Sequence, residues 1–119
     1  MQEIPTQTLV ATADKVALHA KLVGDFNPLH LDEDFAKTTP FGGAIVHGSM
    51  MMNLLVDTLE RALGVSVDAA HLRLRFAAPA MVGETLTAGG APSETAGVYD
   101  VWVARSDGTK SVTGTFTPK

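Results

Sequence analysis

A polar stretch of seven residues, Gly24 to His30, holds the residue types best suited to chemistry in this chain. It contains the carboxylate of Asp25 and the imidazole of His30, and its Pro28 forces Asn27 away from the α-helical region. A turn of this kind folds Asp25 and His30 toward each other. Such a pair, facing one small volume, can hold a water molecule and move its protons. On these residues alone the alternative is an ordinary helix stop, since Gly-Asp and Asn-Pro are common turn dipeptides.

The composition predicts one small folded domain over residues 1–119 and excludes several functions. The 119 residues are 45% hydrophobic and 18% charged, with a net charge of −4. Because phosphate binding needs clustered Lys and Arg, and none occurs, we expect no nucleic-acid partner. The absence of cysteine removes disulfides, thiolate metal sites and thiol nucleophiles. The histidines show no metal-binding spacing, so no metal is expected; they are His19, His30, His47 and His71.

The ends and apolar runs of the chain give no sign of a targeting or membrane segment. The first residues have neither a basic start nor an apolar core, which argues against a signal peptide. No apolar run reaches the roughly 18 residues of a membrane span. The prediction is therefore a cytoplasmic protein without a membrane partner.

Short elements are expected on both sides of the polar stretch. A strand over about residues 6–11 leads to Thr12, which can cap a helix from Asp14 to Val23. Gly24 suits the left-handed end of that helix, and His19 within it is interpreted as a surface residue. After His30 an acidic helical turn is expected, with Phe35 packed inward. The following loop, Lys37 to Gly43, is either a mobile lid or pocket edge, or a plain connector.

The strongest helix pattern in the sequence runs from about Val46 to Leu63. Gly64 stands where the helix should stop. One face is apolar, and it consists of Met51, Leu54, Leu55, Thr58, Leu59 and Ala62. The first half is apolar nearly all round, which predicts burial on several sides. Its methionines are interpreted as core filling.

The second half of the chain is β in character. The run His71–Phe76 alternates strictly, which predicts that Leu72, Leu74 and Phe76 face inward. Further strands are expected near residues 85–88, 97–105 and 111–117, with a hairpin turn at residues 106–109. Short turns between consecutive strands imply an antiparallel sheet. The predicted class is α+β, with one antiparallel sheet wrapped around one long central helix, and its exposed strand edges favour pairing with a second copy.

Two motifs carry a family resemblance, the stretch Gly24–His30 and the later Ile45–Val46–His47–Gly48. With the flanking Leu31–Asp32 and Phe35–Ala36, they resemble the MaoC-like hot-dog family, which includes the R-specific enoyl-CoA hydratases. The resemblance is close over about residues 13–64. It implies a single hot-dog domain and an assembly that is a homodimer or a higher oligomer.

The resemblance also implies roles for individual residues. Asp25 and His30 would be the catalytic pair, and Asn27 and Gly48 would be substrate-binding positions. Asn27 would support the turn, and the backbone N–H of Gly48 would receive the thioester oxygen, as free N–H groups at a helix start can. The expected pocket lining is Phe41, Gly43, Ile45, His47 and Asn53. Two departures are the short chain and the place of a small polar residue along the long helix, where this sequence has Asn53, Val56 and Asp57.

The implied activity is the reversible hydration of a trans-2-enoyl thioester to an (R)-3-hydroxyacyl thioester. No cofactor is expected beyond the thioester itself, whose carrier is CoA or acyl carrier protein. Two alternatives remain open: a hot-dog acyl-CoA thioesterase, and a non-catalytic subunit that binds acyl thioesters. The residues leave open the acyl chain length, the pathway, and which member of the Asp25–His30 pair is the base.

Overall fold

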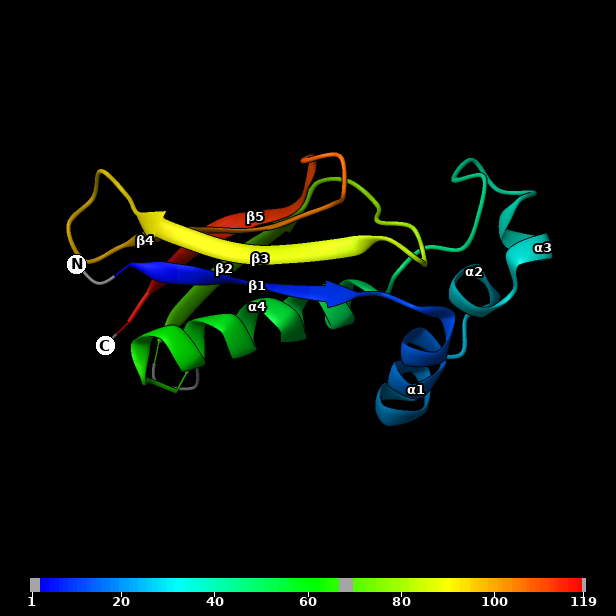
Figure 1. Ribbon diagram of the computed structural model, residues 1–119, viewed down its shortest axis with the longest axis horizontal. Coiled ribbons are helices and arrows are strands. Elements are labelled where there is room, and N and C mark those ends of the chain that lie inside the picture. Colours follow the sequence, from blue (N-terminus) through cyan, green and yellow to red (C-terminus); the bar gives the residue numbers. More distant parts are fainter. Residues whose placement is uncertain (1–2, 67–69, 119) are drawn as a thin grey trace.

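Five antiparallel strands form one sheet in the order β1-β3-β4-β5-β2 (Figure 1). The computed structural model describes residues 3–66 and 70–118. The strands are β1 (Ile4–Val10), β2 (His71–Phe76), β3 (Thr85–Pro92), β4 (Tyr99–Ala104) and β5 (Lys110–Thr117). The predicted antiparallel sheet is confirmed. The predicted hairpin turn is confirmed too, since the N–H of Arg105 donates to the backbone oxygen of Thr109 (2.8 Å).

β3 is longer than its sequence pattern predicts. It continues past Ala88 through Gly89 and Gly90, residues with low strand propensity, because they pair with β4 along its length. A side chain at Gly90 would place its Cβ 2.9 Å from the backbone oxygen of Asp100. The two strands therefore approach closely here, and tertiary pairing overrides the local preference.

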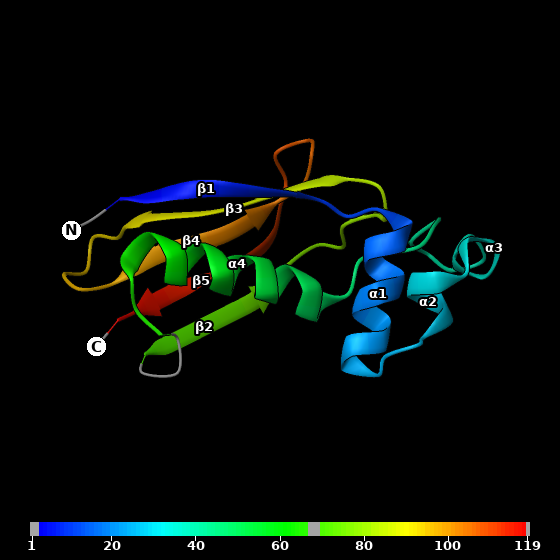
Figure 2. The same ribbon diagram turned by 60° about the horizontal axis from the view of Figure 1, so that its bottom comes forward.

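The long helix α4 (Gly48–Leu63) lies along one face of the sheet, with β1 and β2 at the two edges beside it (Figure 2). It packs against β1, β3 and β4. The predicted apolar face is confirmed, since Met51, Leu54, Leu55, Thr58 and Leu59 are buried and Ala62 is half-buried. Full burial of each large apolar side chain stabilises the fold by roughly 1.5–3 kcal/mol.

Burial of α4 on several sides, however, is not found within this chain. Met52 is 37% exposed, and Asn53 beside it is exposed too. Both lie on the side of the helix that faces away from the sheet, and no other described element covers that side. None of the helices in the described ranges is both long and apolar enough to cross a membrane.

β2 follows its predicted alternation only in part. Leu72 and Leu74 are half-buried, but Phe76 is 53% exposed instead of buried. Its ring still faces the helix, since a Cβ on Gly48 would lie 3.1 Å from Phe76 Cε1. The strand ends at this point, and about half of the side chain stays exposed.

Three short helices lie beyond one end of the sheet (Figure 1): α1 (Ala13–Val23), α2 (Pro28–Leu31) and α3 (Glu33–Ala36). The predicted ends of α1 are confirmed, since Thr12 Oγ1 accepts from the N–H of Lys15 and Gly24 has a left-handed φ of 71°. Phe35 was expected to pack inward, but it is 45% exposed. The chain restarts its helix at Asp32, whose side chain caps α3, and this turn buries Ala36 instead.

Candidate active site

The turn between α1 and α2 brings the carboxylate and the imidazole together as predicted. Asn27 adopts φ −56° and ψ 127°, outside the α region, as Pro28 requires. Asp25 Oδ1 accepts from the N–H of Asn27 (3.2 Å), and Asn27 Oδ1 accepts from the N–H of Leu29 (3.0 Å). Asn27 is thus the N-cap of α2. At the other end of the turn, His30 Nε2 lies 3.9 Å from Asp25 Oδ2.

The hydrogen bond on the far side of the His30 ring fixes which nitrogen carries its proton. His30 Nδ1 lies 2.7 Å from the backbone oxygen of Ile45. A carbonyl oxygen only accepts, so Nδ1 is the N–H and the neutral ring has its lone pair on Nε2, facing Asp25. The 3.9 Å between Nε2 and the carboxylate is too long for a direct hydrogen bond, and a bridging water molecule can contact both groups. Both can take a proton from it.

His47 lies directly behind this pair and is 1% exposed. Its ring stacks on His30 with the centroids 3.9 Å apart, and its Nε2 donates to the backbone oxygen of Asp25 (3.1 Å). His47 therefore supports the turn, and it does not line the hollow at the start of α4. The side chains of Asp25, His30 and His47 each have an oxygen or nitrogen atom that could bind a metal ion, and these three atoms lie within 4.8 Å of one another. The spacing of these residues along the sequence does not reveal this grouping.

The start of α4 lies next to this cluster because His47 is its N-cap residue. The first hydrogen bonds of the helix run from Met50 and Met51 to the backbone oxygen of His47. The N–H groups of Gly48 and Ser49 come before them and have no partner inside the helix. The helix start can therefore donate hydrogen bonds to an oxygen atom that carries negative charge.

A mainly apolar hollow of about 320 Å³ opens at the same helix start. Two of the residues predicted to line the pocket, Phe41 and Ile45, do so, and Phe41 places the loop 37–43 at its edge. Gly43 is buried elsewhere against Glu33 and Met81, and Asn53 is on the exposed side of α4. The lining that sequence reasoning missed is Val46, Met51, Phe76, Ala77, Ala78 and Pro79.

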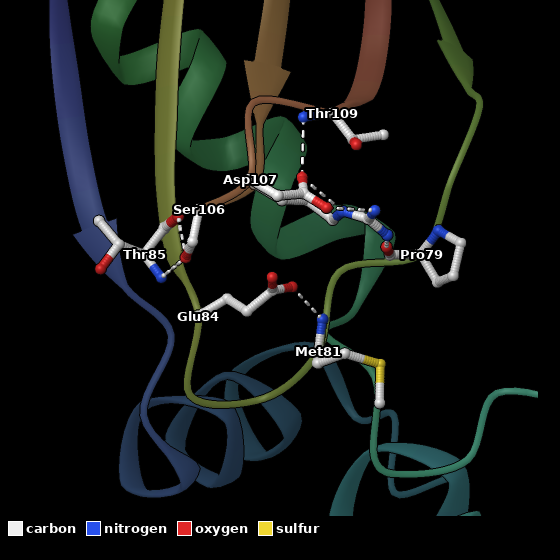
Figure 3. Close-up of polar contacts among 8 residues, drawn as sticks. Pro79, Met81, Glu84, Thr85, Ser106, Asp107 and Thr109 are labelled. Carbon is white, nitrogen blue, oxygen red and sulfur yellow. Dashed lines mark hydrogen bonds and ion pairs between the residues drawn. The ribbon is translucent and has the colours of Figure 1, made fainter.

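The wall of the hollow is held by the tip of the β4–β5 hairpin (Figure 3). Arg105 Nη1 donates to the backbone oxygen of Pro79 (2.9 Å), and its Nη2 pairs with Asp107 at 2.9 Å. The guanidinium of Arg105 and the N–H of Thr109 lower the pKa of Asp107 to about 2. Glu84 accepts from the N–H of Met81 (2.7 Å). These contacts fix the loop between β2 and β3.

That loop in turn fixes the segment leading into α4. The N–H of Val46 donates to Ala80 O (2.8 Å), and the N–H of Val82 donates to Ala44 O (3.0 Å). Ile45, whose backbone oxygen holds His30, forms a bridge with Met81 between these two bonds. The positions of His30 and of the helix start therefore both depend on this short pairing.

His19 was expected on the surface, but it is buried, with 8% exposed. Its Nε2 lies 2.8 Å from Ser49 Oγ, and its ring centroid is 5.0 Å from that of His47. Burial, followed by the effect of His47, lowers the pKa of His19. A signal for this burial was present in the sequence, since His19 follows the buried Val16 by three positions and so lies on the same helix face.

The sequence is similar to a known protein family and to several characterised enzymes. The sequence profile of the family described as MaoC like domain matches residues 2–112. An (R)-specific enoyl-CoA hydratase of Aeromonas caviae is 43% identical over 77 residues, 64% of this chain and 58% of that protein. A 3-hydroxybutyryl-CoA dehydratase of Methylorubrum extorquens is 37% identical over 76 residues, 63% of this chain and 48% of that protein. The matched segments thus span about half the length of these curated relatives.

A solved structure agrees over the whole chain. The structure described as the (R)-hydratase from A. caviae involved in PHA biosynthesis superimposes with a TM-score of 0.77 and 30% sequence identity. The match covers 100% of this chain and 98% of that one. The expected hot-dog fold, an antiparallel sheet around a central helix, is thereby confirmed. The profile match over residues 2–112 and the structural agreement show that this chain belongs to the MaoC-like domain family.

Proposed function

We propose that this protein catalyses the reversible hydration of trans-2-enoyl thioesters to (R)-3-hydroxyacyl thioesters. The observation that carries the proposal is the 3.9 Å approach of His30 Nε2 to the Asp25 carboxylate, with the lone pair of Nε2 on the side that faces it. The names of the similar proteins, an (R)-specific hydratase and a 3-hydroxybutyryl-CoA dehydratase, support the same chemistry.

In the proposed reaction one water molecule lies between Asp25 and His30. The pair removes a proton from the water as its oxygen bonds to C3, and a proton returns from the pair to C2. The atoms of one water are added in total, and the pair ends in its starting state. Each such proton transfer typically contributes 10²–10⁴-fold to the rate. Because both groups lie on one short turn, oxygen and hydrogen add to the same face of the double bond.

Negative charge gathers on the thioester oxygen as C3 is attacked. The N–H of Gly48 at the start of α4 is the proposed partner of that oxygen, since donors placed where charge develops lower the barrier. The hollow of about 320 Å³ beside Gly48 is proposed to hold the acyl group. Its size suits a short acyl chain, carried by CoA or acyl carrier protein.

The test uses trans-2-butenoyl-CoA (crotonyl-CoA) and two readouts in one cuvette. Loss of the absorbance of the conjugated thioester without release of free thiol is the expected result. Thiol that appears in step with turnover would instead identify a thioesterase. No reaction by either readout, with binding of the thioester retained, would identify a non-catalytic binding subunit. An (S)-3-hydroxy product would contradict the proposed R specificity, even if hydration occurred.

A further inference from the structure

His19 and Ser49 form a polar contact between two segments that carry different parts of the candidate active site. His19 is on α1, and the last residue of that helix is followed by Gly24 and then Asp25. Ser49 is on the first turn of α4, directly after Gly48. The 2.8 Å contact from His19 Nε2 to Ser49 Oγ therefore joins the helix that leads to Asp25 with the helix start that follows His47.

We propose that His19 and Ser49 are positioning residues, which fix the first turn of α4 relative to the Asp25–His30 pair. The inference rests on the proposed function, in which Gly48 receives the thioester oxygen while Asp25 and His30 move the protons. Both parts must act on one substrate at once. A shift of the helix start by a fraction of an ångström misaligns them even when each is intact.

The burial of the contact supports this role. His19 is 8% exposed, and burial of a polar group without a partner is costly, so the contact with the Ser49 hydroxyl is retained in the fold. Apolar packing also holds α1, since Val16 and Ala20 are fully buried and Val16 belongs to the hydrophobic core. The His19–Ser49 contact adds a directional polar contact between α1 and α4 to this apolar packing.

The stacking order of the rings connects His19 to the reacting pair. His47 lies between the other two rings, 5.0 Å from His19 and 3.9 Å from His30 by ring centroids. A charged His19 would place a second positive charge near His30, where a proton must arrive during the reaction. Burial lowers the pKa of His19, which favours the neutral ring.

The experiment compares His19→Phe, which keeps the aromatic volume, with Ser49→Ala, which removes the hydroxyl. Each is expected to lower kcat roughly three- to tenfold with KM changed less than twofold, because a shifted helix start weakens interactions made in the transition state more than those made in binding. Since both remove the same contact, the double variant should be no worse than the poorer single one. Ser49→Thr keeps the hydroxyl and is expected to retain at least half of the wild-type kcat.

The controls separate positioning from folding. His71→Phe changes an exposed histidine on β2 and is expected to leave kcat unaltered. If circular dichroism shows that His19→Phe does not fold, the comparison of kcat between Ser49→Ala and Ser49→Thr still tests the positioning role. Equal kcat in Ser49→Ala, Ser49→Thr and wild type would overturn the proposal, as would losses that multiply in the double variant. The proposed function is tested separately, by the activity of the wild type and its loss in Asp25→Asn.

Discussion

At the scale of single residues, the backbone oxygen of Ile45 determines which ring nitrogen of His30 carries the proton. The backbone oxygen of Ile45 fixes the proton on Nδ1, which leaves Nε2 free to take a proton beside Asp25. Asp25 is half exposed, whereas His30 is 12% exposed and rests on the buried ring of His47. The pair thus combines a solvated carboxylate with an imidazole in a fixed orientation.

The first prediction concerns this pair. Asp25→Asn and His30→Ala are each expected to lower kcat by at least about 100-fold, since each removes a group that handles the proton. If the two groups act as a unit, the double variant should be little worse than either single one. Steady-state kinetics on crotonyl-CoA measures this, with the exposed Asp34→Asn as the matched control. Near-normal turnover in either single variant would contradict the proposal that Asp25 and His30 are the catalytic pair.

A second prediction at this scale follows from the titration of His19. Its pKa is lowered below the usual 6.5 by burial and by His47 and His30, against the opposing effect of Asp25. Between the folded pKa and about 6.5, the unfolded chain binds this proton more readily than the folded chain, so acid destabilises the fold there. The stability that His19 contributes is complete above about pH 6.5 and falls as pH drops through that window.

The measurement is the urea midpoint of wild type and His19→Phe across about pH 5 to pH 7.5. The wild type should lose more stability toward acid than the variant does, because Phe does not titrate. His71→Phe, which alters an exposed histidine, should keep the wild-type slope. Parallel curves for wild type and His19→Phe would show that His19 has the same pKa in both states.

At the scale of elements, the position of the site depends on hydrogen bonds that connect one loop to the next. The β4–β5 hairpin holds Pro79 through Arg105, and the loop after Pro79 pairs with residues 44–46 before α4. That segment supplies the oxygen that orients His30. A hairpin tip distant in sequence thus influences the geometry of the turn that carries Asp25 and His30.

The third prediction tests this support. Arg105→Met keeps much of the side-chain length but removes the donor to Pro79 and the partner of Asp107 (Figure 3). We expect a several-fold loss of kcat/KM on crotonyl-CoA, and a pKa of Asp107 that rises from about 2 toward its ordinary value. NMR titration of the Asp107 carboxyl follows the second effect. Arg73→Met, an exposed arginine with no charged partner among residues 3–66 and 70–118, is the control.

If Asp107 shifts as expected while kcat/KM stays at the wild-type value, the hairpin does not support the site. If neither quantity changes, Arg105 does not control the Asp107 charge either. The Arg73→Met control should alter neither one, since its side chain lies on the strand β2 and outside the hollow.

At the scale of the whole molecule, the chain leaves much apolar surface uncovered. It measures 46 × 27 × 19 Å, with the short helices extending beyond the sheet. The exposed side chains include Leu18, Leu22, Phe26, Met52 and Phe76. Among the residues that the structure describes, no strand pairs with the outer edge of β1 or of β2. A second copy of the chain would cover such surfaces and edges.

The fourth prediction is a homodimer that covers the outer side of α4. Multi-angle light scattering at micromolar concentration should give about twice the 12.5 kDa of one chain. Met52→Lys, which places a charge on that side, should shift the mass toward the monomer and lower activity. Glu94→Lys, in the exposed connection between β3 and β4, should do neither. A wild type that is monomeric at all concentrations would contradict the prediction.

The sequence by itself determined the features whose causes lie within a few residues. Pro28 sets the turn that joins Asp25 to His30, Thr12 and Gly24 set the ends of α1, and the apolar spacing of α4 sets its buried face. Backbone restriction, capping and periodicity are local effects. For this reason the turn, the two longer helices and most of the strands could be predicted from the residues alone.

Only the tertiary structure decided what lies behind the Asp25–His30 pair and what surrounds the hollow beside Gly48. His47 stacks on His30, His19 contacts Ser49, and Phe76 faces Gly48. Each of these contacts joins segments separated by 17 to 30 positions. Such pairs depend on how α1, α2, α4 and β2 pack together, and the local preferences of the residues involved do not determine that packing. Local effects therefore account for the turn that carries Asp25 and His30, and tertiary packing accounts for the residues that support it.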